Sequence, residues 1–424
     1  MDFNDFMNLN NFIDFCSSYN RLLCYGAGKY GRVIREFLHE KNIELDAFLV
    51  SDRCQESKIM GIPVYGLQEV SLSDDDIGII IGVGNTYRDE VLRAAESHNA
   101  RHCFTISKKL FSCIERSTAY STSWGNNNIC VLLYHRVADL PMDVWSLAIR
   151  PEVFEAHIRF YKEHYKILRF EDDWSNVREP SLIITFDDGY ADNYYNALPI
   201  LEKYEVPATV FVSTGNLDTD KEFWWDELER IVFFRDISCK EIVFNDKKVP
   251  LTTHDECVRA CRLIRLKLKS MLPLERAKCL NELKKALRSS NCNRRCNRTL
   301  SFEELRKLSE SPYITIGGHT VTHSMLSAQP PDMQMEEIAQ SKAKIENIIN
   351  KSITTFSYPF GGGGDFDKSS LEKVKLAGYE KAATTIGGTV SRHSNPLMIN
   401  RIGVPFWNDI DSLDIWLKQR YCIS

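Results

Sequence analysis

The sequence lacks the features that would direct a chain into or across a membrane. None of its hydrophobic runs approaches the roughly 18 consecutive apolar residues that a transmembrane helix requires. Its first residues, MDFNDFMNLNNFIDF, are acidic and polar and have no basic segment of the kind that opens a secretory signal. We therefore expect a cytoplasmic protein without a membrane-spanning segment.

The chain also has little net charge and no obvious disulfide framework. A formal charge of −5 over 424 residues gives no indication of nucleic acid or an anionic membrane as a partner. The 13 cysteines are odd in number and scattered, which favours reduced thiols. Cys257/Cys261 and Cys292/Cys296 have a CxxxC spacing that leaves a zinc site open. Structural zinc pairs are usually closer together, so thiols on helices are the simpler interpretation.

The length and composition that are present indicate more than one domain. With 43% hydrophobic and 26% charged residues, the composition is that of a globular protein, and 424 residues exceed one ordinary domain. Residues 113–128, which end in STAYSTSWGNNN, are rich in Ser, Thr and Asn and are the expected linker. We expect a small domain over residues 1–115 and a larger one over residues 129–424.

The N-terminal domain has the order strand, glycine-rich turn, helix, strand and acidic residue that is typical of a Rossmann-like fold. These features are the strand 21–25, then Gly26, Gly28 and Gly31, the helix 32–41, the strand 45–50 and Asp52. The region is similar to small Rossmann-type domains that precede some sugar acyltransferases. Two alternatives stay open: a site for a nucleotide, such as that of a nucleotide-sugar, or a scaffold that keeps its glycines for packing.

Two polar stretches of the larger domain predict a metal site. The segment Ser181–Asn193, SLIITFDDGYADN, ends an apolar strand in two adjacent carboxylates, Asp187 and Asp188. Burying both charges is costly unless a cation or protons relieve their repulsion. His319 and His323 are four residues apart, and they would share one face if this stretch is helical. Imidazole nitrogen together with carboxylate oxygen suits a divalent ion.

Together with their flanks, these motifs resemble those of the polysaccharide deacetylases, also called the NodB-homology or carbohydrate esterase 4 family. The resemblance covers roughly residues 129–405 and includes the segments YHRV, ATVFVST and FSYPFG. It implies a distorted (β/α)7 barrel with its site at the carboxyl ends of the strands. Strands, turns and helices alternate along this region as in an α/β barrel or a doubly wound sheet. Residues 223–300 are expected to form a helical insertion.

The resemblance also implies roles for the polar residues. Asp188, His319 and His323 would ligate a divalent metal, most simply zinc, and leave positions open for water and substrate. Such an ion lowers the pKa of its bound water and polarises a carbonyl group. Asp187 would be the general base that takes a proton from the water.

Other positions in the expected site are less complete. Phe360 matches the residue whose backbone N–H helps to hold the oxyanion, and Tyr190 is expected close to the same place. His135 either points toward the mouth of the barrel or is a hydrogen-bonded strand histidine. Ser357 stands where many relatives have the arginine that orients the base, so another residue must do so. His393 lacks the neighbours expected of a general acid, and the sequence identifies no such acid.

The function that these residues predict is metal-dependent removal of an N-acyl group, such as acetyl, from an amino sugar in surface-glycan or polysaccharide biosynthesis. The sugar could be nucleotide-linked or lipid-linked, and formyl or another small acyl group is the alternative. A non-catalytic glycan-binding barrel would require damaged metal ligands, and all three are intact in the sequence. A dehydrogenase would require a domain that faces the nicotinamide, and none is visible in the sequence. The basic helices expected at 257–270 and 274–288 are either a solvated face or a contact surface for an anionic substrate.

Overall fold

A computed structural model describes residues 11–41, 43–51, 57–108, 110–111, 114, 129–245, 247–289, 293–390, 394–406 and 409–421. Internal contacts divide the chain into two compact units, Met1–Ser123 and Trp124–Ser424. No helix in these ranges is long and apolar enough to cross a bilayer.

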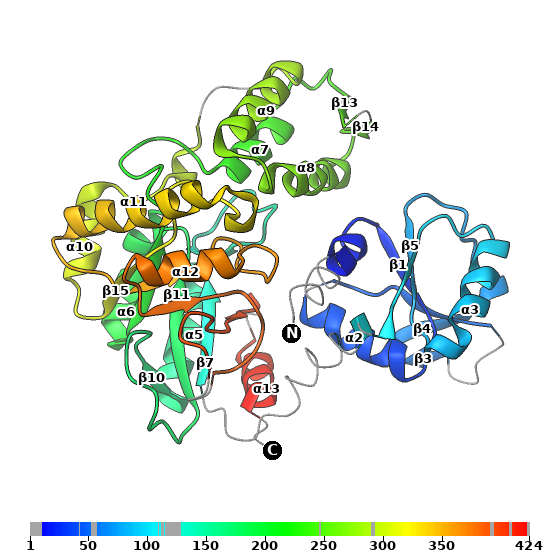
Figure 1. Ribbon diagram of the computed structural model, residues 1–424, viewed down its shortest axis with the longest axis horizontal. Helices are drawn as coiled ribbons and strands as arrows, with labels where there is room; N and C mark the ends of the chain where they lie inside the picture. Colours follow the sequence, from blue (N-terminus) through cyan, green and yellow to red (C-terminus); the bar gives the residue numbers. More distant parts are fainter. Residues whose placement is uncertain are drawn as a thin grey trace. The chain divides into compact units, whose positions relative to one another are not determined.

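The first unit is built on a sheet of order β3-β4-β2-β1-β5-β6, in which only β3 runs antiparallel to its neighbour among the described strands. Figure 1 draws it in blue and cyan. Its elements are β1 (Arg21–Tyr25), α2 (Lys29–Glu40), β2 (Ala47–Val50), β3 (Lys58–Ile59), β4 (Ile62–Gly66), η1 (Leu67–Glu69), β5 (Ile77–Ile81), α3 (Asn85–Ser97) and β6 (Cys103–Thr105).

Both faces of this sheet are covered, as its strand sequences require. In β1, Leu22 packs in one apolar cluster with Phe37 of α2, whereas Leu23 packs in another with Val91 of α3. Successive strand residues point to opposite faces, so a fully apolar strand needs a helix on each side. The expected Rossmann-like α/β domain is confirmed.

The second unit curls a parallel sheet into part of a barrel. Among the described residues the sheet has eight strands, in the order β17-β16-β15-β12-β11-β7-β18, with β10 also paired to β11. A parallel bridge joins Ala383 of β17 to Ile399, just before β18, which brings the two ends of the sheet together. The predicted α/β barrel architecture is thus present as an incomplete, distorted barrel.

Helices cover the outside of this sheet, and apolar side chains fill both of its faces. In β7, Leu132 packs with Phe154 of α5, whereas Val131 packs with Phe211 on the opposite side. The elements before the insertion are β7 (Ile129–Tyr134), β8 (Arg136–Val137), β9 (Ala148–Ile149), α5 (Pro151–His164), β10 (Lys166–Leu168), β11 (Ser181–Phe186), the π-helical η2 (Asn193–Ala197), α6 (Leu198–Tyr204) and β12 (Ala208–Val212). Those after it are α10 (Phe302–Glu310), β15 (Ile314–Gly318), η4 (Leu326–Ala328), α11 (Pro331–Ile349), β16 (Thr355–Ser357), α12 (Lys368–Leu376), β17 (Lys381–Ala383), β18 (Ile402–Gly403) and α13 (Ile410–Tyr421).

Between β12 and α10 the chain forms a lobe with its own apolar core, drawn in green in Figure 1. It contains α7 (Trp224–Phe233), β13 (Glu241–Phe244), β14 (Lys247–Pro250), α8 (His254–Lys269), α9 (Pro273–Ala286) and η3 (Arg295–Asn297). The insertion is mainly helical, as expected, and it also contains an antiparallel hairpin of β13 and β14 that the sequence did not predict. Cys257 and Cys261 are buried in the apolar core of this lobe, in agreement with the simpler reading of the CxxxC spacing.

Buried ion pairs fasten the insertion at its root. Glu222 bonds the Nε atoms of Arg230 at 2.6 Å and Arg294 at 2.7 Å, and Arg294 also pairs with Glu229. An antiparallel bridge between Glu222 and Arg298 joins the two crossings of the chain. The ends of the lobe are therefore held next to each other.

Candidate active site

The polar residues of the second unit meet because their strands run parallel. Asp187 and Asp188 follow β11, His319 follows β15, and Phe360 comes shortly after β16. The carboxyl ends of parallel neighbouring strands lie at one edge of a sheet, which is where barrel enzymes place their sites. The chain thus brings together residues that are far apart in the sequence.

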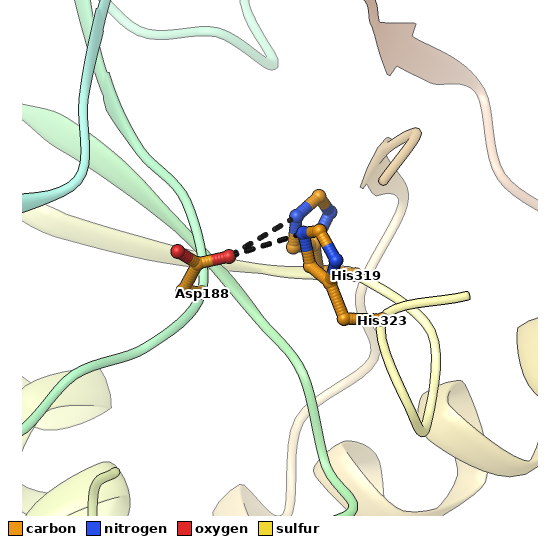
Figure 2. Close-up of side chains that lie close together, drawn as sticks. All are labelled: Asp188, His319 and His323. Atoms are coloured by element: carbon orange, nitrogen blue, oxygen red, sulfur yellow. Dashed lines mark ion pairs between the residues drawn. The ribbon is translucent and has the colours of Figure 1, made fainter. Parts of the chain in front are cut away.

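Asp188, His319 and His323 form a compact cluster of three possible metal ligands, shown in Figure 2. One oxygen of Asp188, Oδ1, lies 3.6 Å from Nε2 of His319 and 3.3 Å from Nε2 of His323. One ligand atom from each residue lies within 4.8 Å of the others, and all three residues are buried. The carboxylate and the two imidazoles therefore converge on one point.

The bonding of this cluster fits a divalent metal. The buried atoms Oδ1 of Asp188 and Nε2 of His319 have no hydrogen-bond partner among the described residues. Nδ1 of His319 lies 2.7 Å from the carbonyl oxygen of Ser357, to which it can only donate. That bond places the proton on Nδ1 and leaves the Nε2 lone pair available, as is usual for a metal-binding histidine.

The two histidines do not lie on a helix, so a shared helix face is not what brings them together. After β15 the chain turns at Thr320, with φ of 63°, and again at His323, with φ of 49°. Asp188 also has a left-handed backbone, with φ of 78°. Residues other than glycine adopt such φ values at a cost of about 1–3 kcal/mol, and such residues cluster at functional sites.

Neighbouring strands hold these strained turns in place. The backbone N–H of Ser213 donates to the carbonyl of Asp188, and that of Thr214 donates to the carbonyl of Thr320, both at 3.1 Å. Both donors directly follow β12, which lies between β11 and β15. The sheet therefore fixes the backbone of the ligand-bearing turns on both sides.

Asp187 occupies a different environment from Asp188. Arg401, which is 1% exposed, donates from Nη1 and Nη2 to the two carboxylate oxygens of Asp187, at 2.7 and 2.6 Å. Ser357 donates to Asp187 at 3.1 Å and accepts from Arg401 at 2.8 Å. Burial alone would raise the pKa of Asp187, but the charges of Arg401 and His319 outweigh it and lower that pKa.

Arg401 is the site residue that the sequence interpretation missed. By resemblance, relatives orient this carboxylate with an arginine at the position of Ser357. In this chain the guanidinium of Arg401, in the segment before β18, binds Asp187 instead. Only one signal pointed to it: an isolated arginine, beside an apolar β-branched residue, in the segment INRIGV.

Comparison with known proteins identifies a related domain in each of the two units. The family model for polysaccharide deacetylases matches residues 175–234 and 289–382 of the chain. The chain contains a polysaccharide deacetylase domain. Enzymes of this family are hydrolases of carbon–nitrogen bonds other than peptide bonds, and we assign the chain to that class. A second model, for the PglD N-terminal domain, matches residues 21–93.

Individual relatives of the deacetylase domain are distant in sequence. The chain is 22% identical over 281 residues to YxkH of Bacillus subtilis (strain 168), a protein assigned to the polysaccharide deacetylases; the match covers 65% of this chain and 70% of YxkH. It is 28% identical over 109 residues to the poly-β-1,6-N-acetyl-D-glucosamine N-deacetylase of Staphylococcus aureus (strain N315), covering 22% of this chain and 38% of that protein.

Solved structures of deacetylases are also similar. That of the Streptococcus pyogenes deacetylase PplD in complex with acetate matches with a TM-score of 0.45 and 20% identity, covering 69% of this chain and 98% of that one. IcaB from Ammonifex degensii matches with a TM-score of 0.43 and 17% identity, covering 70% and 98%.

In the deacetylase domain, Phe360 lies beside the ligand cluster. Its ring centroid is 4.7 Å from that of His323, and its backbone has a left-handed φ of 62°. Its carbonyl accepts a hydrogen bond from Thr385, whereas its N–H has no partner among the described residues. A free N–H next to the ligands is the kind of donor that an oxyanion needs.

The hydroxyl of Tyr190 is bonded to two residues of the insertion. Its hydroxyl donates to Asp226 at 2.7 Å and accepts from the indole of Trp225 at 2.9 Å. The guanidinium of Arg136 stacks on its ring at 4.1 Å. These contacts commit the fully buried tyrosine side chain to the base of the insertion, and its hydroxyl is not a donor to the site.

His135 follows β7 directly beside Asp187. Tyr134 and Phe186 are partners in register, and the N–H of Asp187 donates to the carbonyl of Tyr134 at 3.1 Å. Burial lowers the pKa of the His135 imidazole, and the charges of Asp188 and Asp187 oppose this effect. His135 thus shares the environment of the two carboxylates, whereas His393 lies outside the described residues.

The glycine-rich turn of the first unit has two kinds of glycine. A side chain on Gly26 would meet the carbonyl oxygen of Gly82 at 2.5 Å, and one on Gly31 would meet that of Gly26 at 1.8 Å. Gly28, which caps α2, has nothing within 4 Å of such a side chain. The first and third glycines therefore serve packing, whereas Gly28 faces open space. Asp52 lies outside the described residues.

The first unit also contains a cavity of about 220 Å³, which lies between the end of β1 and α3. Among described residues, its lining includes none of the three glycines. The lining residues are Tyr25, Ser51, Leu67, Gln68, Glu90, Val91, Ala94 and His98.

Proposed function

We propose that this chain removes a small acyl group, acetyl in the first place, from the nitrogen of an amino sugar with the help of a divalent metal. The observation that carries the proposal is the convergence of Asp188, His319 and His323 at the carboxyl edge of a deacetylase sheet. A bound ion would act as a Lewis acid toward the acyl carbonyl and would make a water molecule more acidic. Carboxylate and imidazole ligands suit zinc, which is the ion we propose.

Asp187 is the proton acceptor in this proposal. Its two oxygens are held by Arg401, so its orientation is fixed and its pKa is kept low. It therefore remains ionised at neutral pH and can accept a proton from the attacking water. A positioned base of this kind contributes about 10²–10⁴-fold to the rate.

The remaining steps need a donor to the developing oxyanion and a donor to the leaving nitrogen. The N–H of Phe360, which has no partner among the described residues, serves the first. His135, beside Asp187 at the end of β7, is the residue we propose for the second. Replacing His135 with Gln should slow hydrolysis of an N-acetyl sugar far more than that of an acetyl ester with a good leaving group. Equal slowing of both would remove His135 from this step.

The relatives support the substrate class that we propose, which is broader than the substrate named for any one of them. The Staphylococcus aureus relative is named for the deacetylation of poly-β-1,6-N-acetyl-D-glucosamine. We propose an acylated amino sugar of a surface glycan or its precursor, with a nucleotide- or lipid-linked sugar as one form. A formyl group in place of acetyl is the second candidate.

A panel assay tests the proposal. The zinc-loaded chain is incubated with N-acetyl and N-formyl amino sugars, free, as oligosaccharides, nucleotide-linked and lipid-linked, and acetate or formate release is measured. The Asp188→Ala variant is the control, since it should lose the metal and the activity. Wild-type protein that binds zinc stoichiometrically but releases neither acid from any member would contradict the proposal.

A further inference from the structure

The insertion faces the candidate active site with a buried cation that lacks a carboxylate partner. Arg276, on α9, is 3% exposed and donates through Nη2 to the carbonyl of Thr322 at 3.1 Å. Among the residues that the structure describes, its other terminal nitrogen, Nη1, is buried without a hydrogen-bond partner, and Arg276 forms no ion pair. Thr322 immediately precedes His323, so this guanidinium lies next to the ligand cluster.

A second unpartnered donor accompanies Arg276. The guanidinium carbon lies 4.8 Å from the ring centroid of Trp224, whose Nε1 is also buried and has no hydrogen-bond partner in the described part of the chain. The Trp224 ring is in turn 6.3 Å from that of Phe360, which contacts His323. Two adjacent donors that lack acceptors therefore border the residues of the site.

Two further cations, both from α8, lie near the ring of Phe360. Arg265 and Lys269 lie 5.6 and 4.6 Å from the ring centroid of Phe360. Lys269 is paired with Asp365 at 2.5 Å. Arg262, also on α8, is exposed. The cations near Phe360 thus come from one face of the insertion.

A buried guanidinium with a free N–H is costly unless an acceptor completes it. Burial lowers the pKa of Arg276 to about 10, against the opposing charge of Glu337, so the group stays charged at neutral pH. Guanidinium groups bind carboxylate and phosphate oxygens through two parallel N–H bonds. An oxyanion is a ligand that matches this charge and can accept a hydrogen bond from Nη1.

We propose that Arg276 and Trp224 form a subsite for an oxyanion, a phosphate or a carboxylate, that the substrate carries next to its acylamino group. The proposal rests on the proposed function, since it names the class of amino sugar that this deacylase accepts. A sugar phosphate of a nucleotide- or lipid-linked precursor and a uronate residue of an acidic glycan are the two sources of such a group.

Direct binding tests the subsite without requiring turnover. Zinc-loaded full-length chain is titrated by calorimetry with N-acetylglucosamine 1-phosphate, with a disaccharide of N-acetylglucosamine and a uronate, and with the neutral methyl glycoside of N-acetylglucosamine. We expect at least one anionic ligand to bind 10-fold or more tightly than the neutral glycoside. The tighter of the two identifies the source of the oxyanion.

Variants assign that preference to the subsite. Arg276→Gln should weaken the preferred anionic ligand about 10-fold or more and leave the neutral glycoside unchanged, with zinc content retained. Arg262→Gln, an exposed arginine on the same insertion, is the matched control and should change neither affinity. Arg276→Lys keeps the charge without the paired donors and should give an intermediate loss, which also covers the case in which Arg276→Gln does not fold.

Three outcomes would overturn the subsite. The first is a wild-type protein that binds the anionic and neutral ligands equally, which rules out the subsite whatever the variants do. An anionic preference that persists in the Arg276 variants would assign it to the metal or to α8. If the Arg276 variants lose affinity for the anionic and the neutral ligands equally, Arg276 only stabilises the structure of the site. Failure of the proposed deacylation appears separately, as binding without release of acid.

Discussion

At the scale of single residues, the adjacent carboxylates Asp187 and Asp188 look equivalent in the sequence and are not equivalent in the structure. Asp188 points an oxygen without a hydrogen-bond partner at two imidazoles, whereas both oxygens of Asp187 bind Arg401. A ligand and a base should respond differently to mutation, because only the ligand supplies charge to the metal.

We expect Asp188→Ala to lose both zinc and activity. Asp187→Asn keeps the shape of the side chain but removes the proton acceptor, so zinc content should stay near that of the wild type while kcat falls by about 10²–10⁴-fold. Metal analysis paired with acetate release on the two variants measures this. Loss of zinc from Asp187→Asn with retention in Asp188→Ala would reverse the two roles.

Arg401 should matter for stability as well as for activity. Its side chain is buried and neutralises a buried carboxylate, and breaking such a pair costs about 3–5 kcal/mol because one charge is left uncompensated. We expect Arg401→Met to lower the free energy of unfolding by that amount and to lower kcat, as measured by urea denaturation and acetate release.

The double variant Arg401→Met/Asp187→Asn is the matched control. It removes both charges, so it should regain much of the stability of the wild type without regaining activity. A double variant as unstable as the single one would mean that Arg401 acts through its packing and its bond to Ser357.

At the scale of elements, the sequence predicted what local patterns determine. The apolar composition of residues 181–186 predicts a buried strand, and the structure has one there. The position of Asp187 and Asp188 at its end could therefore be predicted from the sequence. The hairpin of β13 and β14 was missed, since Lys247 and Lys248 give it little β-forming pattern and its apolar residues pack only inside the insertion. Arg401 was missed because its partner lies 214 residues away in the chain.

The turn before α2 offers a test of the nucleotide hypothesis at this scale. Gly28 has a φ of −78° and open space around it, so Gly28→Val should fold normally. If the start of α2 binds a phosphate, the valine side chain would block its approach. We expect calorimetry with a nucleotide and nucleotide-sugar panel to show binding by the wild type and none by the variant.

Gly31→Ala is the contrasting change. Its new methyl group would lie 1.8 Å from a backbone oxygen, so we expect it to destabilise the first unit by at least about 2 kcal/mol. Absence of heat from the wild type across the whole panel would favour the scaffold interpretation, and a Gly28→Val variant that still binds would move the ligand away from this turn.

The start of α7 carries a buried acid that should make stability depend on pH. Burial raises the pKa of Asp226 to about 8, against the opposing charge of Arg136 and the hydrogen bond from Tyr190, with Glu229 adding to the rise and Arg294 opposing it. In the unfolded chain the same group titrates at about 3.9. Its contribution to stability is therefore complete below about pH 4 and is lost as the pH rises through about 8.

We expect Asp226→Asn to flatten this dependence, because the amide does not titrate. Between about pH 5 and pH 8 the wild type should lose up to about 1.4 kcal/mol per pH unit relative to the variant. Urea denaturation followed by tryptophan fluorescence measures it, since all seven tryptophans lie between residues 124 and 416. Parallel curves for the two proteins would show that Asp226 is ionised in the folded state.

At the scale of the whole molecule, the two units have separate cores, and the candidate metal ligands belong to the second alone. Removing the metal should therefore affect only one of them. We expect a chelator to abolish acetate release and to lower the unfolding temperature monitored by tryptophan fluorescence. A metal at 100 times its Kd stabilises the folded state by about 2.7 kcal/mol.

Any nucleotide binding by the first unit should survive the chelator, and added zinc should restore the activity. A parallel loss of both functions would mean that the units are coupled.

The fastening of the insertion at its root has a consequence for how such a protein can diversify. The chain leaves the barrel at Glu222 and returns at Arg298, and the bridge between these two residues keeps exit and entry adjacent whatever lies between them. A segment with neighbouring ends can be lengthened, shortened or exchanged at little cost in loop-closure entropy. The insertion, and with it the selectivity of the enzyme, can thus change in evolution while the strands that position Asp188 and His319 keep their sequence.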